Sequence, residues 1–532
     1  MASTRVNEAA LVPGSPEERA EFARLQKTLP RMFREVFPDP AAARTIVVLP
    51  SLSLDADVLA KVAGVHHYEE RMLSLLMLLR MPRTRIVYLT SEPIPDAIVD
   101  YYLHLLPGVP TAHARARLTL LSCFDGSAHP LTQKILERPR LIARVREAIE
   151  DLGAAHIAAF TVSALERTLA VTLGAPIYGC DPDLQVFGTK SGGRRVFREA
   201  GVAMPDGVED LTDEADIAEG LAELKRRDPH LKRAVVKLNE GFSGEGNALF
   251  RFDGSPSGKG LAAWIRARLP ELAFEARDMT WDAYLSKARQ MGAIVEAFIE
   301  GEEKRSPSAQ FRIDPLGAWE AVSTHDQVLG GPSGQVFLGC RFPADEGYRL
   351  AIQSEGAKVA AVLAKQGVMG RLGVDFVSVR RGDSWVNSAI EINLRKGGTT
   401  HPFLMLQFLT GGAYDPASGE FLTPAGHRRF YYASDNLEAA HYRGLTPHDL
   451  VDLAVINSLH YDGTVNEGTV FHLIGALSEF GKLGVVCVGA SIERADALYR
   501  RTIEILDREQ RAPALSEKAR NRSHRTSRKS HG

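Results

Sequence analysis

Residues 370–402 read GRLGVDFVSVRRGDSWVNSAIEINLRKGGTTHP, and the interpretation of the whole chain starts from them. They predict two β-strands, Leu372–Val379 and Trp385–Asn393, because both segments are rich in Val, Ile and Phe. The residues between them, Arg381-Gly382-Asp383, are typical of a tight turn. The stretch therefore predicts a β-hairpin.

Each expected strand carries one carboxylate. The midpoint of Asp375 and Glu391 is residue 383, inside the turn, so a register centred there makes them cross-strand neighbours with Cβ atoms roughly 4.5–5.5 Å apart. Glu391, Asn393 and Arg395 alternate and so project from one face. Hard oxygen ligands beside a guanidinium suit Mg²⁺ that also holds phosphates, with Mn²⁺ as a substitute. The alternative is a solvated hairpin face that contains an incidental ion pair.

Composition fits a multidomain enzyme. At 532 residues, and with about 100–200 residues per domain, three or four domains are expected. The 64 basic and 66 acidic residues give no argument for nucleic acid or a membrane as the main partner. The most apolar helical run, Met72–Leu79, is too short to cross a bilayer, and no apolar segment follows the N-terminal charges. Four widely spaced cysteines indicate neither a disulfide framework nor a thiolate zinc site. We expect a cytoplasmic protein.

The chain divides into five expected segments. Residues 1–43 form an extension with a helix that begins after Ser15, and 44–186 alternate apolar strands with helical runs, which predicts a parallel α/β sheet. Residues 187–425 mix helices with the strands that carry the chemistry. Residues 426–510 form a small α/β unit with helices 446–458 and 492–506 and strands 469–473 and 484–488. Residues 511–532 are basic and nearly without apolar side chains, so they are expected to be disordered.

Phosphates need a binding site, and two familiar ones are excluded. Residues 254–260, GSPSGKG, are one residue short of a P-loop and end in Gly where Ser or Thr should reach Mg²⁺. Residues 241–246 lie between two expected strands, whereas a dinucleotide fingerprint opens a helix. They predict a glycine-rich flap in which Gly241 and Gly244 let backbone N–H groups face an anion and Ser243 adds a hydroxyl.

Two lysines are candidates for binding phosphate. Lys237 lies on the expected strand Arg233–Leu238 that enters the flap; an exposed position is equally open for it. Lys190 begins an expected helix whose free N–H groups favour anions and whose C-cap is Gly201; alone, it would be read as an exposed loop residue. The order of these features along the chain strengthens both assignments.

That order resembles the ATP-grasp superfamily over roughly 188–405. The resemblance implies ATP bound between two α+β subdomains, phosphate contacts from Lys190, Lys237 and the flap, and Mg²⁺ ligation by Asp375, Glu391 and Asn393. Residues 294–303 are similar to the superfamily's inter-lobe strand. The carbonyls of Glu296 and Ala297 and the amide of Ile299 would then read adenine, and Glu303, with Glu302 as competitor, would bind the ribose.

A closer resemblance covers nearly the whole chain. Segments such as YEERMLSLLMLLRMPRTRIVYLTSEPI and EINLRKGGTTHPF are similar to the pheganomycin-type peptide ligases. The resemblance implies a Rossmann-like pre-ATP-grasp domain, an ATP-grasp core and a small C-terminal α/β domain. Many superfamily members have Glu where Asp375 stands, and the flap here has its own spacing.

The implied activity is an ATP-dependent ligation of a carboxylate donor and an amino-acid or peptide amine, through an acyl phosphate, in peptide natural-product biosynthesis. Arg395 is the expected catalytic residue, because guanidinium matches carboxylate geometry; the alternative is an ion pair with Glu391. Another ATP-grasp reaction, phosphotransfer or carboxylation, and an inactive nucleotide-binding scaffold are the other hypotheses. Substrate identity and oligomeric state are open, with a homodimer as a common arrangement.

Overall fold

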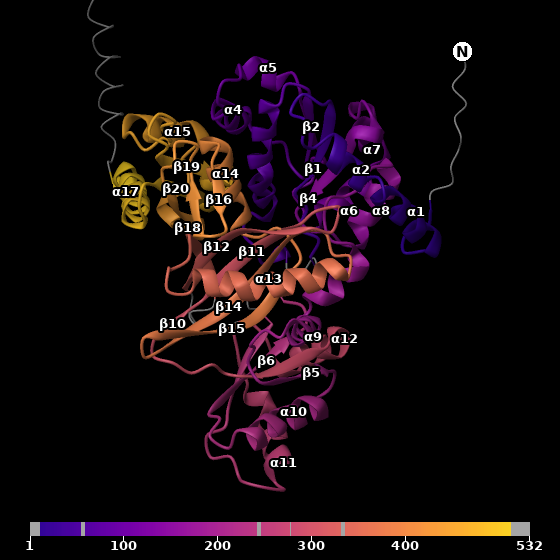
Figure 1. Cartoon of the computed structure of the whole chain (residues 1–532), viewed down its shortest axis with the longest axis vertical. Helices are drawn as coiled ribbons and strands as arrows, with labels where there is room; N and C mark the ends of the chain where they lie inside the picture. Colours follow the sequence, from indigo (N-terminus) through magenta and orange to yellow (C-terminus); the bar gives the residue numbers. More distant parts are fainter. Residues whose placement is uncertain (1–10, 55–58, 242–245, 277, 331–335, 512–532) are drawn as a thin grey trace, which may run out of the picture.

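The structure is a computed structural model that describes residues 11–54, 59–241, 246–276, 278–330 and 336–511. The predicted flap residues Ser243 and Gly244 and the predicted basic tail beyond residue 511 lie outside the described residues. The described residues form four β-sheets, and Figure 1 shows how they are arranged. Among the described residues, no helix has the length and hydropathy needed to span a membrane.

The first part of the chain forms the predicted parallel sheet, with strand order β3-β2-β1-β4. Its strands are β1 (Arg44–Leu49), β2 (Thr84–Thr90), β3 (Leu118–Ser122) and β4 (Ala155–Ala159). The connecting helices are η1 (Val65–Arg80), α4 (Asp96–His104), α5 (Thr111–Arg115), α6 (Leu131–Leu136), α7 (Pro139–Ala148), η2 (Leu152–Ala154) and α8 (Ala164–Leu173). The apolar run at residues 68–79 is therefore helical, but it is a 3₁₀-helix.

The N-terminal extension packs on this sheet domain. As predicted, Ser15 caps helix α1 (Pro16–Gln26), with its hydroxyl accepting a hydrogen bond from the backbone of Glu18. A second helix, α2 (Leu29–Glu35), follows. Gln26 exchanges two hydrogen bonds with the backbone of Ile177, at 2.8 and 2.9 Å, which fixes α1 against the domain.

A separate lobe contains the two strands that flank the predicted glycine flap. Its sheet has the order β5-β9-β6-β7-β8, and in Figure 1 it lies at the lower end of the molecule. The strands are β5 (Gly207–Leu211), β6 (Arg233–Leu238), β7 (Asn247–Arg251), β8 (Ala273–Phe274) and β9 (Ala293–Ala297). The helices are η3 (Pro182–Gly188), α9 (Lys190–Ala200), α10 (Glu214–Arg227), α11 (Leu261–Arg266), η4 (Leu269–Glu271) and α12 (Trp281–Met291). The predicted strand–loop–strand arrangement is confirmed, because β6 and β7 pair antiparallel.

The largest sheet carries the hairpin and continues into the C-terminal region. Its order is β10-β14-β11-β12-β13-β18-β20-β19, with β15 paired to β14. The strands are β10 (Lys304–Arg305), β11 (Pro307–Ile313), β12 (Trp319–Gly330), β13 (Val336–Phe342), β14 (Gly370–Arg381), β15 (Ser384–Asn393), β18 (Phe430–Glu438), β19 (Gly468–His472) and β20 (Lys482–Gly489). Strands β16 (Ala413–Asp415) and β17 (Glu420–Leu422) form a small ribbon. The helices are α13 (Arg349–Lys365), α14 (Thr400–Thr410), η5 (Ala440–Tyr442), α15 (Pro447–Ile456), α16 (Ala476–Phe480) and α17 (Ile492–Arg511).

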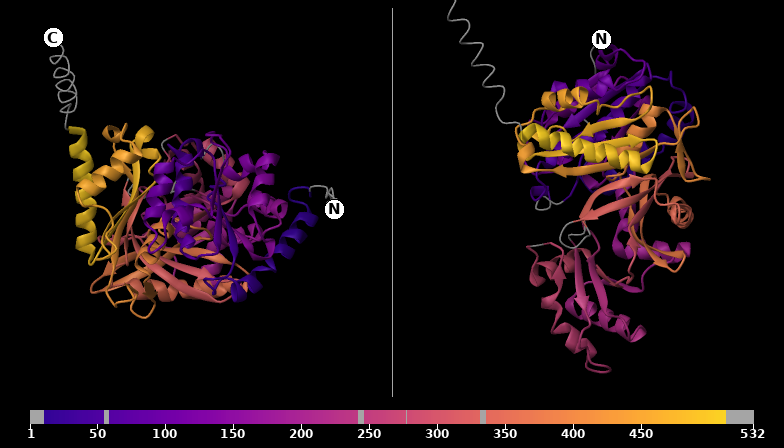
Figure 2. Two further views of the ribbon diagram at one scale, coloured as in Figure 1. Left: turned by 90° about the horizontal axis from the view of Figure 1, so that it is seen from above. Right: turned by 90° about the vertical axis from the view of Figure 1, so that its left-hand side faces the viewer.

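The large sheet does not end at the domain boundary expected from the sequence. One sheet crosses the expected boundary at residues 425/426, because β13 pairs with β18. One hydrophobic core likewise joins Tyr102 of the first domain, Phe403 of α14 and Val486 of β20. The division into domains stays a prediction. Figure 2 shows the C-terminal strands beside the first domain and the β5–β9 lobe projecting away from both.

Strand β12 runs without interruption from Trp319 to Gly330, so His325, Asp326 and Gln327 lie within a strand. One expectation from the sequence needs correction. The inter-lobe strand expected at residues 294–303 ends at Ala297, because the backbone then leaves the ladder before β10 begins. The four cysteines are all buried and free, as expected.

Candidate active site

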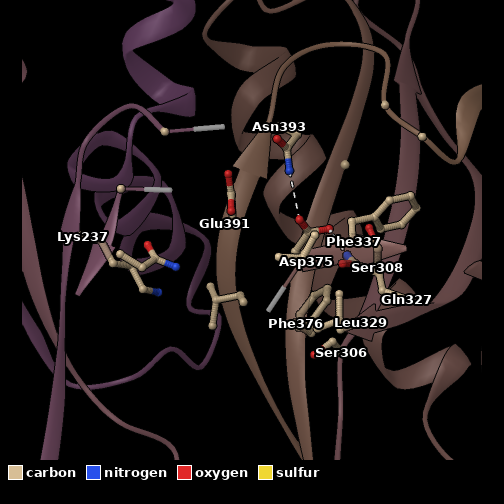
Figure 3. Close-up of a pocket in the computed structure, with 18 of the residues that line it drawn as sticks. Lys237, Ser306, Ser308, Gln327, Leu329, Phe337, Asp375, Phe376, Glu391 and Asn393 are labelled. Atoms are coloured by element: carbon tan, nitrogen blue, oxygen red, sulfur yellow. Dashed lines mark hydrogen bonds between the residues drawn. The ribbon is translucent and has the colours of Figure 1, made fainter. Parts of the chain in front are cut away.

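A cavity of about 570 Å³ lies where the lobes meet. The β5–β9 lobe contributes Lys237 and Gly241, and the large sheet contributes the hairpin carboxylates. In Figure 3 Lys237 faces Glu391 and Asp375 across the cavity. The remaining wall comes from the first domain and from β18 and β20, so residues far apart in sequence share one space.

The hairpin register brings the two carboxylates together as predicted. Asp375 of β14 pairs with Glu391 of β15. The turn contains only Gly382 and Asp383, and Gly382 has a φ of 60°, which favours glycine. A bulge after Asp375 leaves Ile390 without a cross-strand partner. Without that extra residue the two-residue turn would pair Asp375 with Ile390, so the correct pairing depends on a bulge that the sequence analysis did not foresee.

Asp375 is held by two side-chain amides. Gln327 Nε2 donates to Asp375 Oδ1 at 3.1 Å, and Asn393 Nδ2 donates to Asp375 Oδ2 at 3.0 Å (Figure 3). Burial, reinforced by the nearby charge of Glu391, raises the pKa of Asp375 to about 6. Asp375 therefore lies in a setting that resists a bare negative charge and favours a cation beside it.

Glu391 is paired with the first predicted phosphate-binding lysine. Lys190 Nζ lies 2.6 Å from Glu391 Oε1. Burial alone would raise the pKa of Glu391, but Lys190, Arg395 and Lys237 together lower it below the ordinary value. Lys190 is the first residue of α9, whose cap Thr189 accepts a hydrogen bond from the backbone of Gly192 at 3.0 Å, and Gly201 closes the helix as predicted.

Lys237 is placed by a second buried ion pair. Its Nζ lies 2.6 Å from Glu296 Oε2, and the other oxygen of Glu296 lies 2.7 Å from Arg194 Nη1. Lys237 and Glu296 lie on neighbouring antiparallel strands, β6 and β9. The alternative of an exposed Lys237 does not hold, since only 12% of its side chain is exposed and it lines the cavity.

The donor set fits a hard divalent cation better than a transition metal. Among the described residues no group of three or more His, Cys, Asp and Glu is arranged to hold a metal. Asp375 and Glu391 offer carboxylate oxygens, and Asn393, which donates through its Nδ2, keeps its amide oxygen free of that bond. Two carboxylates and one amide suit Mg²⁺, which usually takes few protein ligands and completes its shell with water and phosphates.

Arg395 lines the same cavity beyond the carboxylates. Its Nη1 donates to the carbonyl of Lys396 at 3.5 Å, and no carboxylate of the described residues lies within 4.0 Å of its guanidinium. The alternative of an ion pair with Glu391 is therefore not realised within that distance, although the two charges still influence each other.

The residues predicted to contact adenine and ribose fall into two groups. Ala297 and Ile299 line the cavity, as does the flap residue Gly241, and the Ile299 carbonyl accepts a hydrogen bond from Lys304 Nζ at 3.3 Å. Glu296 lines it too, although its backbone belongs to a strand paired on both sides.

The structure does not bring Glu303 to the cavity. Its carboxylate contacts Arg305 at 3.3 Å and Arg380 at 3.4 Å, and Glu303 is not among the residues that line the cavity. Glu302, its competitor, is exposed and does not line the cavity either. The reason is that the chain leaves β9 at Ala297, earlier than the expected strand end, which changes the direction of the following segment.

Several cavity residues were missed from the sequence. Ser308 of β11 pairs with Asp375 on the side opposite Glu391. The alternation of Ser308 and Gln310 with apolar residues in PSAQFRI was the available signal, since a polar stripe within a buried strand faces a polar site. Arg71 and Asp435 also line the cavity, and no local motif marks them.

Comparison with known proteins agrees with this arrangement. Residues 183–253 and 260–416 match a family model described as IQCH-like, ATP-grasp, and residues 449–502 match one described as PGM1 C-terminal domain. The chain is 33% identical over 473 residues to L-propargylglycine–L-glutamate ligase of Streptantibioticus cattleyicolor, a match that covers 87% of this chain and 93% of that relative.

Two more distant matches also extend over most of this chain. IQ motif-containing protein H of Danio rerio is 23% identical over 526 residues, and the match spans 49% of that longer protein. Among solved structures, the biotin carboxylase domain of Hydrogenobacter thermophilus 2-oxoglutarate carboxylase, in complex with MgADP, ADP and bicarbonate, aligns with a TM-score of 0.52 at 14% identity. That alignment covers 87% of this chain and 89% of the other, and at this identity it supports the fold alone.

Proposed function

Because this chain belongs to the ATP-grasp superfamily, and within it to the pheganomycin-type peptide ligases, we propose that the cavity is where it joins a carboxylate to an amine at the expense of ATP. The family relationship identifies an ATP-dependent ligase that forms C–N bonds. The roles of individual residues, the metal and the substrates are the proposal.

One observation supports the proposal above others: two cation–carboxylate pairs, one within the β5–β9 lobe and one that joins this lobe to the large sheet, converge on one cavity. Lys190 pairs with Glu391, and Lys237 pairs with Glu296. Lysines exchange partners readily because an ammonium is a compact point charge on a flexible stem. When phosphates enter, both lysines can turn to them, and Asp375 and Glu391 are left to a divalent cation.

Nucleotide binding is assigned to the part of the cavity next to the β5–β9 lobe. The base is assigned to the segment that follows β9, where Ala297 and Ile299 line the wall. The phosphates are assigned to Lys190, Lys237 and the flap that begins at Gly241. The ribose contact stays open, because Glu303 lies outside the cavity.

Asp375, Glu391 and Asn393 are the residues that would hold Mg²⁺. When bound there, Mg²⁺ would neutralise part of the charge on the ATP phosphates. Gln327 would keep the Asp375 carboxylate oriented, since it donates to one of its oxygens at 3.1 Å.

The proposed reaction has two steps. In the first, an oxygen of the donor carboxylate attacks the γ-phosphorus of ATP, the bond to the bridging oxygen breaks, and ADP leaves. In the second, the amine attacks the carbonyl carbon of the acyl phosphate, phosphate leaves, and the amine loses a proton. Arg395 is assigned to the donor carboxylate and then to the oxyanion, where a planar fork with several N–H donors is well suited.

Both substrates are proposed to be amino acids or close analogues. The name of the relative from Streptantibioticus cattleyicolor specifies two amino acids, L-propargylglycine and L-glutamate. By analogy, we place this chain in the assembly of a small peptide natural product. A homodimer and a cytoplasmic location stay predictions.

An isotope experiment tests the acyl phosphate. A donor whose carboxylate carries ¹⁸O is incubated with the chain, ATP, Mg²⁺ and an amine. The proposal predicts one ¹⁸O atom in the released inorganic phosphate and ADP as the nucleotide product. Release of AMP, with ¹⁸O in the AMP, would instead indicate an adenylate and would contradict the assigned role of the phosphate-binding lysines.

A further inference from the structure

The cavity extends past Arg395 toward the first and last parts of the chain. The wall there is made of Tyr68 and Arg71 from η1, Phe160 directly after β4, Asp435 from β18 and Lys482 from β20. Phe160 follows the carboxyl end of β4 in a parallel sheet whose strand order reverses between β1 and β4. Ligands of open α/β sheets bind at such ends. None of these residues has a role in the assignment of nucleotide and metal described above.

Arg71 is the unusual member of this set. Only 7% of the residue is exposed, yet its Nη2 has no hydrogen-bond partner among the described residues. Its Nε donates to the Tyr68 carbonyl at 3.4 Å, and its Nη1 lies 3.6 Å from Asp435 Oδ2, which is too long for a strong hydrogen bond. A buried guanidinium nitrogen without an acceptor is costly, so a ligand acceptor is its natural complement.

The aromatic rings hold the guanidinium in place. Its central carbon lies 4.2 Å from the Tyr68 ring centroid and 4.9 Å from the Phe160 ring centroid. These contacts favour a cation and leave the edge of the planar fork for hydrogen bonds. Arg71 is therefore fixed without being neutralised.

The charges near Arg71 leave an excess of positive charge. Burial lowers the pKa of Arg71, and the nearby charge of Arg395 lowers it further. Lys482 is also close to Tyr68, with its Nζ 5.2 Å from that ring centroid. The three cations here are Arg71, Arg395 and Lys482. The carboxylates that oppose them are Asp435, near Arg71, and Glu438, which lies 4.0 Å from Lys482. Such a wall attracts an anion.

We propose that Arg71, oriented by Asp435 and Tyr68, binds the free carboxylate of the amine substrate, and that this substrate is an amino acid. The inference rests on the proposed ligase function. A cavity of about 570 Å³ must also hold the nucleotide, which favours a single amino acid over a long peptide. The carboxylate would fix the amine toward Arg395, where the acyl phosphate is assigned.

The amine substrate is favoured over the donor for a specific reason. The donor is already anchored, because its reacting carboxylate is assigned to Arg395 and lies beside the cation that the metal-binding carboxylates would hold. The amine has no reacting charge that these groups could hold, yet it must be kept close to the acyl phosphate for efficient attack. Among the described residues of the cavity wall, Arg71 and Lys482 are the cations without another assignment, and Arg71 is the one with a buried nitrogen that lacks an acceptor.

The test compares amino acids that lack a side-chain carboxylate with their C-terminal amides as amines, because such an amide can act only as the amine and never as the donor. The full chain, ATP and Mg²⁺ are supplied with a pool of common L-amino acids together with the amides of those that lack a side-chain carboxylate, and product masses are recorded. We expect products whose amine component keeps its free C-terminal carboxylate to exceed those whose amine component is an amide by about tenfold or more. Arg71→Met should bring the two classes to comparable amounts.

A binding measurement keeps the test independent of turnover. In equilibrium dialysis with MgADP, Arg71→Met should retain the amino-acid pool about tenfold more weakly than the unaltered chain, and Arg71→Lys should fall between them. The affinity for MgADP should be unchanged in both. Arg80→Met, at the exposed end of the same helix, is the control and should behave like the unaltered chain.

Three results would overturn the proposal: amides incorporated as well as acids by the unaltered chain, equal retention of amino acids by the unaltered chain and Arg71→Met, or a change in Arg71→Met confined to the concentration dependence on the donor. The last result would assign Arg71 to the donor instead. If MgADP binds normally but no product forms, the ligase function would be contradicted. The dialysis result would still decide the role of Arg71.

Discussion

At the scale of single residues, the site consists of charges that compensate one another in pairs around the cavity. Lys190 pairs with Glu391 from the large sheet, Lys237 pairs with Glu296 within its own lobe, and Asp375 relies on amide donors. Each carboxylate of these pairs has a second cation nearby. The loss of one lysine therefore changes ligand binding without leaving an isolated buried carboxylate. This arrangement sets the expected outcome of each substitution.

Lys237→Ala should weaken MgATP binding about tenfold or more while the chain stays folded. The fold should survive because Glu296 keeps its contact with Arg194 at 2.7 Å. Calorimetric titration with MgADP and a thermal melt measure the two quantities. Lys232→Ala, exposed at the start of the same strand region, serves as control. Unchanged nucleotide affinity in a well-folded Lys237→Ala chain would remove Lys237 from the phosphate site.

Arg395→Lys should reduce kcat more than it weakens MgATP binding. Lysine keeps the charge but loses the planar fork that matches a carboxylate. Steady-state kinetics at saturating donor and amine, compared with the MgADP dissociation constant, separate the two effects. Equal losses in both quantities would indicate that Arg395 acts mainly through the Glu391 charge.

Asp375 should make stability depend on pH. Burial, with the charge of Glu391, raises its pKa to about 6, above the ordinary 3.8, so the folded chain holds a proton in this interval that the unfolded chain has released. Stability contributed by this group therefore falls as pH rises through the interval, and the cost is complete above about pH 6. Without divalent cation, Asp375→Asn should gain on the order of 1–3 kcal/mol at pH 8 and little at pH 4.

Thermal melts of both chains across that pH range provide the measurement. Added Mg²⁺ should stabilise the unaltered chain at pH 8 and lose this effect as the pH falls toward 5, because protons and the cation compete for Asp375. A gain for Asp375→Asn that is the same at every pH would contradict the assignment of this titration.

At the scale of elements, the sequence predicted the strands of the hairpin, the helix at Lys190 and the strand–loop–strand flap, because each has a clear local signature. It could not predict the bulge at Ile390, since a bulge is selected by the sheet around it and leaves no mark in alternation. The prediction that Glu303 lies in the site was wrong. Strand β9 ends at Ala297, and the direction of the chain after it depends on contacts between lobes, which a local sequence pattern does not record. Arg71 and Asp435 were missed for the same reason.

Gly192 should be more critical to the site than its neighbour Gly193. A Cβ on Gly192 would clash with the backbone carbonyl of Val186, which precedes α9, whereas a Cβ on Gly193 would meet atoms of Ile392 and Phe187 only at 3.8 Å. Gly192→Ala should therefore displace the start of α9 and Lys190 with it. We expect a lower Tm and weaker MgADP binding for Gly192→Ala, and near-normal values for Gly193→Ala.

Alanine has the higher helix propensity, so Gly193→Ala should be neutral or slightly stabilising. The pair is thus a matched control for the substitution itself. Similar losses in both variants would mean that α9 tolerates no side chain at either position and that Val186 is not the decisive contact.

At the scale of the whole molecule, the first domain and the C-terminal region support each other. The Tyr102 hydroxyl donates to the Phe471 carbonyl at 3.2 Å, and the Phe471 amide donates to the Tyr101 hydroxyl at 3.0 Å. Glu70 accepts a hydrogen bond from the backbone of Gly475 at 3.0 Å. Arg71 follows Glu70 directly, so the packing that joins the ends of the chain also positions the proposed amine site.

Removal of residues 426–532 should prevent folding. The loss would expose the side of β13 that pairs with β18 and a large part of the shared core. Soluble yield, size-exclusion behaviour and the cooperativity of the thermal melt measure the outcome. Removal of residues 512–532 alone is the control and should leave MgADP binding intact. A monomeric, cooperatively melting fragment that ends at residue 425 would show that the C-terminal region is an independent unit.

The most direct measurement is phosphate release from ATP with Mg²⁺, made with common amino acids singly and in pairs, and with the product masses recorded. We predict release that needs both a carboxylate and an amine, a product equal to their sum minus water, and loss of both signals by about a hundredfold or more in Glu391→Gln. Release that needs no amine, or an undiminished rate in Glu391→Gln, would contradict this prediction.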